Sequence, residues 1–241
     1  IWRIPRRESI VLTPSHCPIC NKRIKFYENI PILSWALLNG KCSKCKSNIS
    51  IVYPIVELVT GGLFAITYIH SFLLNYSLPM LIASLVGICM FMSVFFIDLQ
   101  HKIIPNKITY FAIIFSLIMS TIFPSYTGQK THELGFVNSL SGLVVGGAIL
   151  SIISFAGRKF FKQEIIGDGD IKYMAAIGAC FGLLPPAWFF ILLIGSLLGF
   201  FSGLTLIIFK KKSFDSIIPF GPFLSIAGII WVLYGKEIIH I

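Results

Sequence analysis

Seven apolar runs dominate this 241-residue sequence and restrict what it can fold into. The runs are Pro54–Leu74, Leu78–Ile97, Ile108–Phe123, Leu140–Ala156, Tyr173–Leu184, Trp188–Phe209 and Ile217–Leu233. A helix needs roughly 20 residues to cross the hydrocarbon of a bilayer, or about 17 at the low end. The chain is 56% hydrophobic and only 12% charged, whereas about a quarter of a soluble domain is charged. The sequence therefore predicts a polytopic all-α membrane protein with about seven spans.

One apolar run is shorter than the others and is too short to cross the hydrocarbon as a regular helix. Tyr173–Leu184 ends at Pro185-Pro186, and proline cannot continue a helix without breaking a backbone hydrogen bond. We expect a half-span or a broken helix there.

The placement of basic residues predicts the orientation. If residues before Pro54 are cytoplasmic and each run crosses once, segments 1–53, 98–107, 157–172 and 210–216 share that side. They hold nine, two, four and three Lys or Arg, which is 18 of the 20 in the chain, as the positive-inside rule requires. These residues favour contact with anionic lipid, so the bilayer is an expected partner. Because they are spread over four loops, no nucleic-acid partner is expected.

Composition divides the chain into residues 1–53 and residues 54–241. The first part is polar, basic and rich in Cys, Pro and Asn, and the second carries the apolar runs. The sequence opens with Ile-Trp-Arg-Ile-Pro-Arg-Arg, which lacks the apolar core of a signal peptide. It also opens without methionine, so we expect a further segment upstream.

Four cysteines form the most specific local pattern. Cys17 and Cys20 make one CxxC pair, and Cys42 and Cys45 make another after a spacer of 21 residues, Asn21–Lys41. Two such pairs can close a tetrahedron of thiolates around zinc, and a region of about 50 residues needs a staple of this kind. We predict a small cytoplasmic zinc-ribbon-like domain with a closed, structural zinc site. Redox or free-thiol chemistry is the alternative.

Two aspartates lie at the cytoplasmic ends of apolar runs. Asp98 follows the run Leu78–Ile97, and Asp170 ends the tetrad Gly167-Asp168-Gly169-Asp170. Carboxylates at such positions are rare and usually functional. Two carboxyls that meet at one water form an acid–base dyad, as in aspartic proteases. Gly167 and Gly169 would leave room for a peptide strand. The alternatives are a polar cap for Asp98 and a helix N-cap for Asp170.

Other polar residues near these positions have plainer interpretations. We interpret His101 as an interfacial residue, Asp168 as solvated and Lys172 as a marker of the cytoplasmic boundary. Glu57 is either a contributor to function or a span-end carboxylate with a structural partner.

The order of motifs along the chain is similar to that of a known family. The motifs are Arg3-Ile4-Pro5-Arg6, Ser15-His16-Cys17-Pro18-Ile19-Cys20, Asn29-Ile30-Pro31-Ile32-Leu33-Ser34-Trp35, Gly40-Lys41-Cys42-Ser43-Lys44-Cys45, Tyr53-Pro54-Ile55-Val56-Glu57-Leu58, Ile97-Asp98 with Ile104-Pro105-Asn106, Gly167-Asp168-Gly169-Asp170-Ile171-Lys172 and Pro219-Phe220-Gly221-Pro222-Phe223-Leu224. In these the chain resembles the type IV prepilin peptidases, bifunctional leader peptidases and N-methyltransferases of the bacterial inner membrane.

The resemblance implies specific roles. Asp98 and Asp170 would be the catalytic pair, the second in a G-x-G-D signature shared with presenilin-like intramembrane proteases. The four-cysteine loop is typical of the bifunctional members. The family's usual first span is absent here, so we expect eight spans in the full protein.

The resemblance also implies substrates and a methyl donor. The substrates would be prepilins and pseudopilins of type IV pili and type II secretion, cleaved after a glycine at the cytoplasmic boundary. S-adenosylmethionine would then methylate the new amino terminus. The chain has no glycine-rich Rossmann fingerprint, so no residue is assigned to the methyl donor.

Two other functions stay open at this point. One is a peptidase whose zinc domain only scaffolds. The other is a non-enzymatic membrane assembly subunit or transporter, although transporters place charged groups near the membrane midplane.

Overall fold

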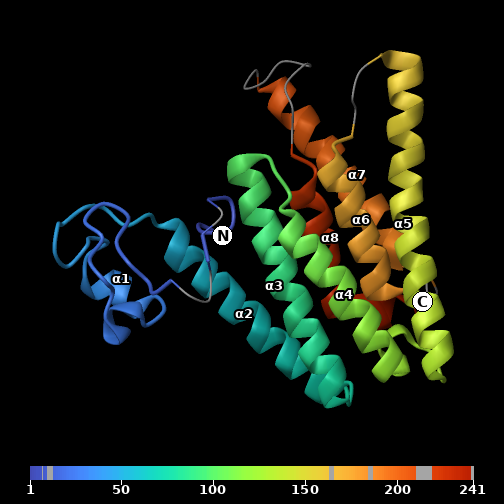
Figure 1. The fold of residues 1–241 in the computed structure, drawn as a ribbon, viewed down its shortest axis with the longest axis horizontal. Helices are drawn as coiled ribbons and strands as arrows, with labels where there is room; N and C mark the ends of the chain where they lie inside the picture. The colour runs from blue at the N-terminus through green and yellow to red at the C-terminus, as the bar shows by residue number, and fades with distance from the viewer. Residues whose placement is uncertain (7, 10–12, 163–165, 184–186, 210–218, 240–241) are drawn as a thin grey trace. The chain divides into compact units, whose positions relative to one another are not determined.

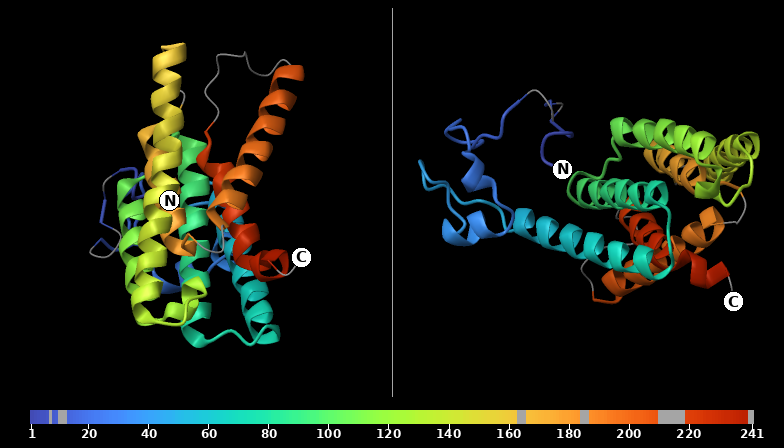
Figure 2. Two further views of the ribbon diagram at one scale, coloured as in Figure 1. Left: turned by 90° about the vertical axis from the view of Figure 1, so that its right-hand side faces the viewer. Right: turned by 90° about the horizontal axis from the view of Figure 1, so that it is seen from below.

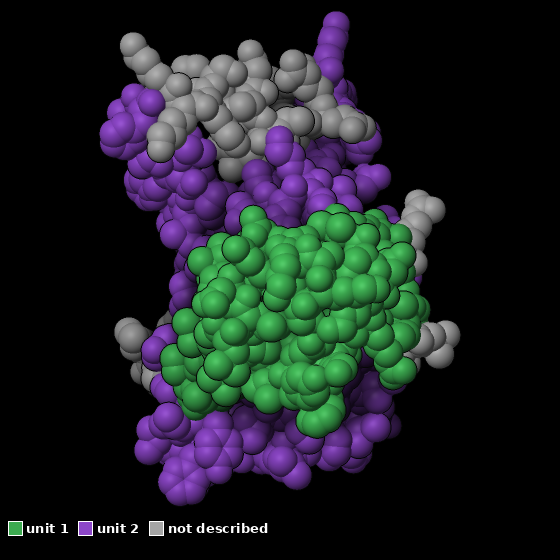
Figure 3. All heavy atoms as spheres, turned by 90° about the vertical axis from the view of Figure 1, so that its left-hand side faces the viewer, with its two compact units in different colours: residues 1–66 green, residues 67–241 purple. Residues whose placement is uncertain are grey.

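The computed structural model describes residues 1–6, 8–9, 13–162, 166–183, 187–209 and 219–239. The chain divides by its internal contacts into residues 1–66 and residues 67–241 (Figure 3). The described residues contain helices and two isolated β-bridges, with no β-strand.

Residues 1–66 hold two short helices and the first part of a long one. They are η1 (Phe26–Asn29), α1 (Leu33–Leu37) and the beginning of α2 (Val52–Leu73). The two bridges pair His16 with Arg23 and Lys41 with Asn48, so each closes the chain around one CxxC pair.

Residues 67–241 contain the rest of α2 and a helical bundle. The bundle consists of α3 (Leu78–His101), α4 (Asn106–Ile122), η2 (Pro124–Thr127), α5 (His132–Phe161), α6 (Asp168–Phe181), α7 (Ala187–Ile208) and α8 (Gly221–Ile239). Figures 1 and 2 show α5 beside α6 and α3 beside α8. These two pairs and the pair α7–α8 form the most extensive helix contacts of the bundle. Helices α2 to α8 correspond in order to the seven apolar runs.

Four helices are long and apolar enough to cross a membrane. They are Val52–Leu73, Leu78–His101, His132–Phe160 and Ala187–Ile208, among the residues that the structure describes. Helix α4 and the apolar part of α8 are shorter, and α6 has 14 residues. The expected break at Pro185-Pro186 lies outside the described residues, but α6 has already ended at Phe181, where Gly182 takes a φ of 75°.

Helix α5 begins earlier than the sequence predicts. The polar composition of the loop Pro124–Val137, with its Gly and Pro, predicts irregular structure, but α5 begins at His132. The side chain of Thr131 accepts a hydrogen bond from the backbone N–H of Leu134 at 3.3 Å. This N-cap satisfies one of the free donors at the helix start, so the polar residues of the loop extend the helix.

Glycines bring α5 and α6 into backbone contact. A Cβ added to Gly142 would run into the carbonyl of Gly178, and one added to Gly178 would run into the carbonyl of Gly142. Gly146 lies against the carbonyl of Met174. These α5 glycines therefore serve helix packing, because small residues let two membrane helices approach backbone to backbone.

Candidate functional site

Asp98 is a buried residue in the last turn of α3. The helix continues to His101 and ends at Lys102, whose φ is 54° and whose N–H bonds to the Asp98 carbonyl at 2.8 Å. The Asp98 residue is 5% exposed, so it is not a solvated cap at the end of a span. Its Oδ2 accepts a hydrogen bond from the backbone N–H of Gly221 at 3.0 Å.

The donor to Asp98 is the first residue of α8. The first N–H groups of a helix have no partner inside it, and that end carries partial positive charge. The sequence motif Pro219–Leu224 contained Gly221, but nothing in the local pattern indicated a contact with a residue 123 positions away.

Asp170 lies in the first turn of α6. The helix begins at Asp168 and Gly167 is its N-cap, so the interpretation of Asp170 as the N-cap is wrong. The backbone N–H of Asp170 bonds to the Gly167 carbonyl at 3.1 Å. Its Oδ1 is buried and has no hydrogen-bond partner among the described residues. A negative charge on a buried oxygen without a hydrogen-bond partner is costly. This favours a protonated carboxyl, or a bound molecule that donates a hydrogen bond to Oδ1.

Ile104 connects the surroundings of the two aspartates. A Cβ on Gly221 would lie 2.7 Å from Asp98 Oδ2 and 3.1 Å from Ile104 Cδ1. A Cβ on Gly169 would lie 3.3 Å from Ile104 Cβ. The starts of α6 and α8 therefore both pack on Ile104. The segments that hold the two aspartates singled out from the sequence thus meet at this residue.

The polar neighbours of the pair lie in different settings. Lys172 donates to Asn106 Oδ1 at 3.2 Å and so ties α6 to α4. Asp168 and His101 are exposed. Asp168 therefore offers a solvent-facing carboxylate only two residues from Asp170, whose Oδ1 is buried.

The four cysteine sulfurs of residues 1–66 form one cluster. All four Sγ atoms lie within 4.8 Å of one another, with 3.8 Å between those of Cys17 and Cys45 and 4.0 Å between those of Cys20 and Cys42. Four thiolates about 2.3 Å from a tetrahedral zinc are about 3.8 Å apart. The spacing fits a metal of this size, so the cluster could hold one.

Each cysteine pair is built by the same local turn. The N–H of Cys17 bonds to the Lys22 carbonyl at 2.9 Å and that of Cys42 to the Ser47 carbonyl at 2.8 Å. The residue after each pair has a positive φ, 52° at Asn21 and 59° at Lys46. Backbone hydrogen bonds from Cys20 and Ile19 lower the pKa of Cys17 to about 6, which favours the thiolate form that binds metal.

His16 does not belong to this cluster. Its Nδ1 lies 3.1 Å from the carbonyl of Pro14 and its ring meets that of Trp2 edge-on. The cysteines thus supply every potential ligand of the cluster among the described residues.

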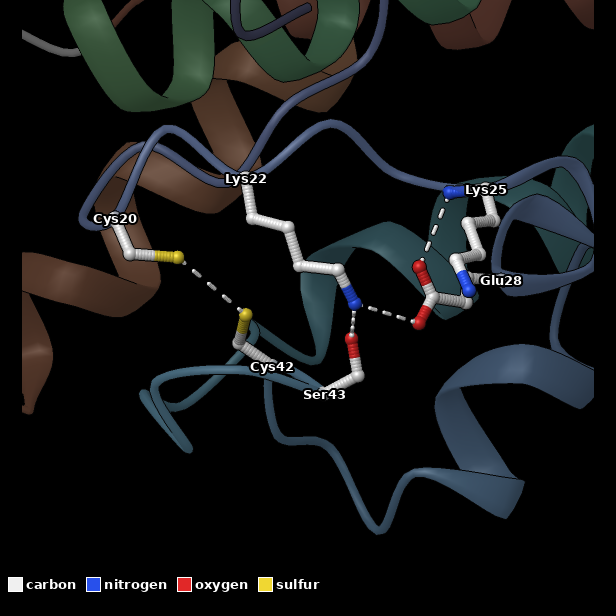
Figure 4. Close-up of polar contacts among 6 residues, drawn as sticks. All are labelled: Cys20, Lys22, Lys25, Glu28, Cys42 and Ser43. Carbon is white, nitrogen blue, oxygen red and sulfur yellow. Dashed lines mark hydrogen bonds and ion pairs between the residues drawn. The ribbon is translucent and has the colours of Figure 1, made fainter.

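A polar cluster links the two cysteine turns (Figure 4). Lys22 Nζ lies 3.1 Å from Glu28 Oε1 and 2.5 Å from Ser43 Oγ, and Glu28 Oε2 accepts from the Lys25 N–H at 3.0 Å. The Ser43 hydroxyl and the Lys25 N–H, with Lys22, lower the pKa of Glu28 to about 2. Lys22 belongs to the first cysteine turn and Ser43 to the second. The cluster therefore links the two turns by contacts that do not involve the thiols.

Glu57 has a structural partner inside residues 1–66. Its Oε2 accepts a hydrogen bond from the backbone N–H of Ile32 at 2.7 Å. Ile32 has a φ of 63°, a strained value for a β-branched residue. The carboxylate therefore stabilises an unfavourable turn just before α1.

Comparison with known proteins identifies the family. Residues 1–71 match the bacterial peptidase A24 N-terminal domain, and residues 85–204 match the type IV leader peptidase family. A relative from Legionella pneumophila, a prepilin leader peptidase/N-methyltransferase, is 34% identical over 96% of this chain and 76% of its own length. The chain belongs to the type IV leader peptidase family.

Other members of the type IV leader peptidase family extend this comparison. Relatives with the same description from Bacillus subtilis (strain 168) and Aeromonas hydrophila are 34% and 33% identical, over 98% and 95% of this chain and 88% and 74% of their own lengths. No solved structure matches the chain. The resemblance to prepilin peptidases inferred from the motifs is confirmed.

Proposed function

We propose that this leader peptidase family member cleaves the basic leaders of prepilins or pseudopilins and then methylates the new amino terminus. The observation that carries the proposal is the convergence on Ile104 of the helix starts beside Asp98 and Asp170, where Asp98 is buried and Asp170 Oδ1 is buried without a partner among the described residues. The names of the relatives support both activities.

The proposed peptidase chemistry uses one ionised and one protonated aspartate. Two carboxylates that share one site do not both ionise comfortably, so the pair shares a proton and titrates as a unit. The ionised carboxylate removes a proton from the attacking water. The protonated carboxyl polarises the scissile carbonyl, and a proton then passes to the leaving amine.

The proposed orientation places the dyad at the cytoplasmic face of the bacterial inner membrane. Both aspartates then lie at the cytoplasmic boundary of the membrane, on the side that holds most of the basic residues. A prepilin has a polar leader in the cytoplasm and an apolar segment in the bilayer, so its cleavage site lies at the same level.

We further propose that the four cysteines hold a structural zinc ion. The sulfur spacing and the lowered pKa of Cys17 support this assignment. Zinc would cross-link the two cysteine turns and stabilise residues 1–66, which have little apolar core. S-adenosylmethionine is the expected methyl donor and would act as a second substrate.

The test is the mass of a pilin made with this protein. The full-length protein is co-expressed with a prepilin in a bacterium that lacks its own leader peptidase, and the intact pilin is weighed. We expect loss of the leader plus one methyl group. Asp98→Asn and Asp170→Asn should abolish cleavage, whereas Asp168→Asn, the matched exposed acid in the same helix turn, should preserve it.

Each other outcome has a defined meaning. Leader loss without the methyl group indicates a peptidase whose cysteine region is a scaffold. An untouched prepilin, with protein present at normal abundance in the membrane, contradicts the proposal and favours a non-enzymatic assembly role.

A further inference from the structure

Buried hydrogen bonds on both sides of the Gly221 backbone link Tyr173 and Ser225 to Asp98. The Gly221 N–H bonds to Asp98 Oδ2 at 3.0 Å, Ser225 Oγ bonds to the Gly221 carbonyl at 2.8 Å, and the Tyr173 hydroxyl lies 2.8 Å from Ser225 Oγ. Tyr173 and Ser225 are both 0% exposed. These bonds start on α6, run through α8 and reach α3.

The direction of the bonds follows from the number of protons. A serine hydroxyl has one proton, and the Ser225 proton points to the Gly221 carbonyl. Tyr173 must therefore donate to Ser225. Tyr173 thus holds Ser225, and Ser225 holds the carbonyl of Gly221, while the N–H of the same residue, in the preceding peptide unit, contacts Asp98.

The same bonds also connect the two halves of the proposed dyad. Tyr173 follows Asp170 by three residues in α6, which puts the two on neighbouring positions of one helix face. Tyr173 therefore links the helix that carries Asp170 to the helix whose first N–H contacts Asp98.

The contact leaves one oxygen of Asp98 for the reaction. Oδ2 accepts from the Gly221 N–H at 3.0 Å, and a Cβ on Gly221 would lie 2.7 Å from that atom. Within the described part of the chain, this is the hydrogen bond of the Asp98 carboxyl, and Oδ1 makes none.

We infer that Tyr173 and Ser225 are positioning residues that hold the Gly221 N–H against Asp98 Oδ2 and thereby direct Oδ1 at the attacking water. This inference rests on the proposed function, because it assigns a task to the aspartate dyad. A purely structural role would require only that these buried hydroxyls be satisfied, and it would not link their loss to the rate of the chemical step.

The test compares cleavage kinetics of purified full-length variants on one purified prepilin in detergent micelles. Ser225→Ala should lower kcat about tenfold, the effect of losing one net hydrogen bond that holds the reacting group, with KM unchanged within about twofold. Tyr173→Phe should show a smaller loss of the same kind. The double variant should match Ser225→Ala, because Tyr173 acts only through Ser225.

Ser116→Ala is the matched control. Ser116 is also 0% exposed and donates to Cys180 Sγ at 2.9 Å in the same bundle, but Cys180 lies ten residues beyond Asp170 in α6. This variant should keep the normal kcat. Thermal unfolding of every variant shows whether it is folded, and Tyr173→Phe, which removes only one oxygen, serves if Ser225→Ala does not fold.

The outcomes separate this inference from the proposed function. Normal kcat in both Tyr173→Phe and Ser225→Ala, with Asp98→Asn inactive, overturns the positioning role and leaves the dyad standing. A raised KM with normal kcat, or independent multiplying losses in the double variant, also overturns it. Cleavage at the normal rate by both Asp98→Asn and Asp170→Asn contradicts the proposed function itself.

Discussion

Gly221→Ala is the smallest change that should disturb Asp98 without removing any of its hydrogen bonds. The added Cβ would lie 2.7 Å from Asp98 Oδ2, 3.2 Å from its Cγ and 3.1 Å from Ile104 Cδ1. Ordinary van der Waals contact of a Cβ begins at 3.4 Å, so the carboxyl must retreat by about 0.7 Å. The φ of Gly221 is outside the left-handed region, so alanine itself adopts the backbone conformation without strain.

The expected consequence is a large loss of turnover in a folded protein. A misplacement of about 1 Å at a reacting group costs about a hundredfold in rate, so we expect kcat to fall by about 10- to 100-fold. Overpacking of this kind costs about 1–3 kcal/mol of stability. The assay is prepilin cleavage by the purified variant, followed by mass spectrometry, beside its thermal unfolding.

Gly87→Ala provides the control on the helix that carries Asp98. A Cβ at Gly87 would meet its nearest atoms at 4.0 Å, so this variant should cleave at the normal rate. If Gly221→Ala is folded and its kcat stays within about twofold of normal, the carboxyl of Asp98 is not held as tightly as we argue, and the reasoning fails.

Three further predictions concern packing and the cysteine region. Gly178→Ala should lower bundle stability by about 1–3 kcal/mol in detergent unfolding, because its Cβ meets the α5 backbone, whereas Gly62→Ala, with nothing within 4 Å, should not. Cys42→Ser should lose the bound zinc, measured as metal per chain, and make residues 1–66 sensitive to protease; Cys89→Ser should do neither. Glu28→Gln at neutral pH should also increase that sensitivity without loss of metal, because it weakens the link between the cysteine turns.

The sequence was most informative where a single physical requirement acts along the chain. Apolar runs must become helices in a bilayer because their backbone groups need internal partners, and α2 to α8 follow the seven runs. The CxxC spacing likewise brings four thiols together, since each pair closes its own turn. Residue type and short spacing are sufficient for both.

The sequence was less informative where distant residues decide the structure. The polar composition of the loop Pro124–Val137 predicted irregular structure, but α5 begins within it at His132, where Thr131 is the N-cap. The partners of Asp98 come from helix starts and side chains far along the chain. No periodic pattern encodes a bond between Tyr173 and Ser225, because it depends on how α6 and α8 pack.

The 30 residues of α5 make it about 45 Å long, while bilayer hydrocarbon is about 30 Å thick. About ten of its residues must therefore stand clear of the lipid tails. The chain returning toward α6 is already level with Ser154, whose Oγ bonds to the Ile166 carbonyl at 3.4 Å, about two turns before α5 ends. The start of α6, and with it Asp170, thus lies at least about two turns short of the tip of α5. Hydrolysis needs water at that level, so the thickness of the surrounding membrane sets whether water or lipid surrounds the start of α6.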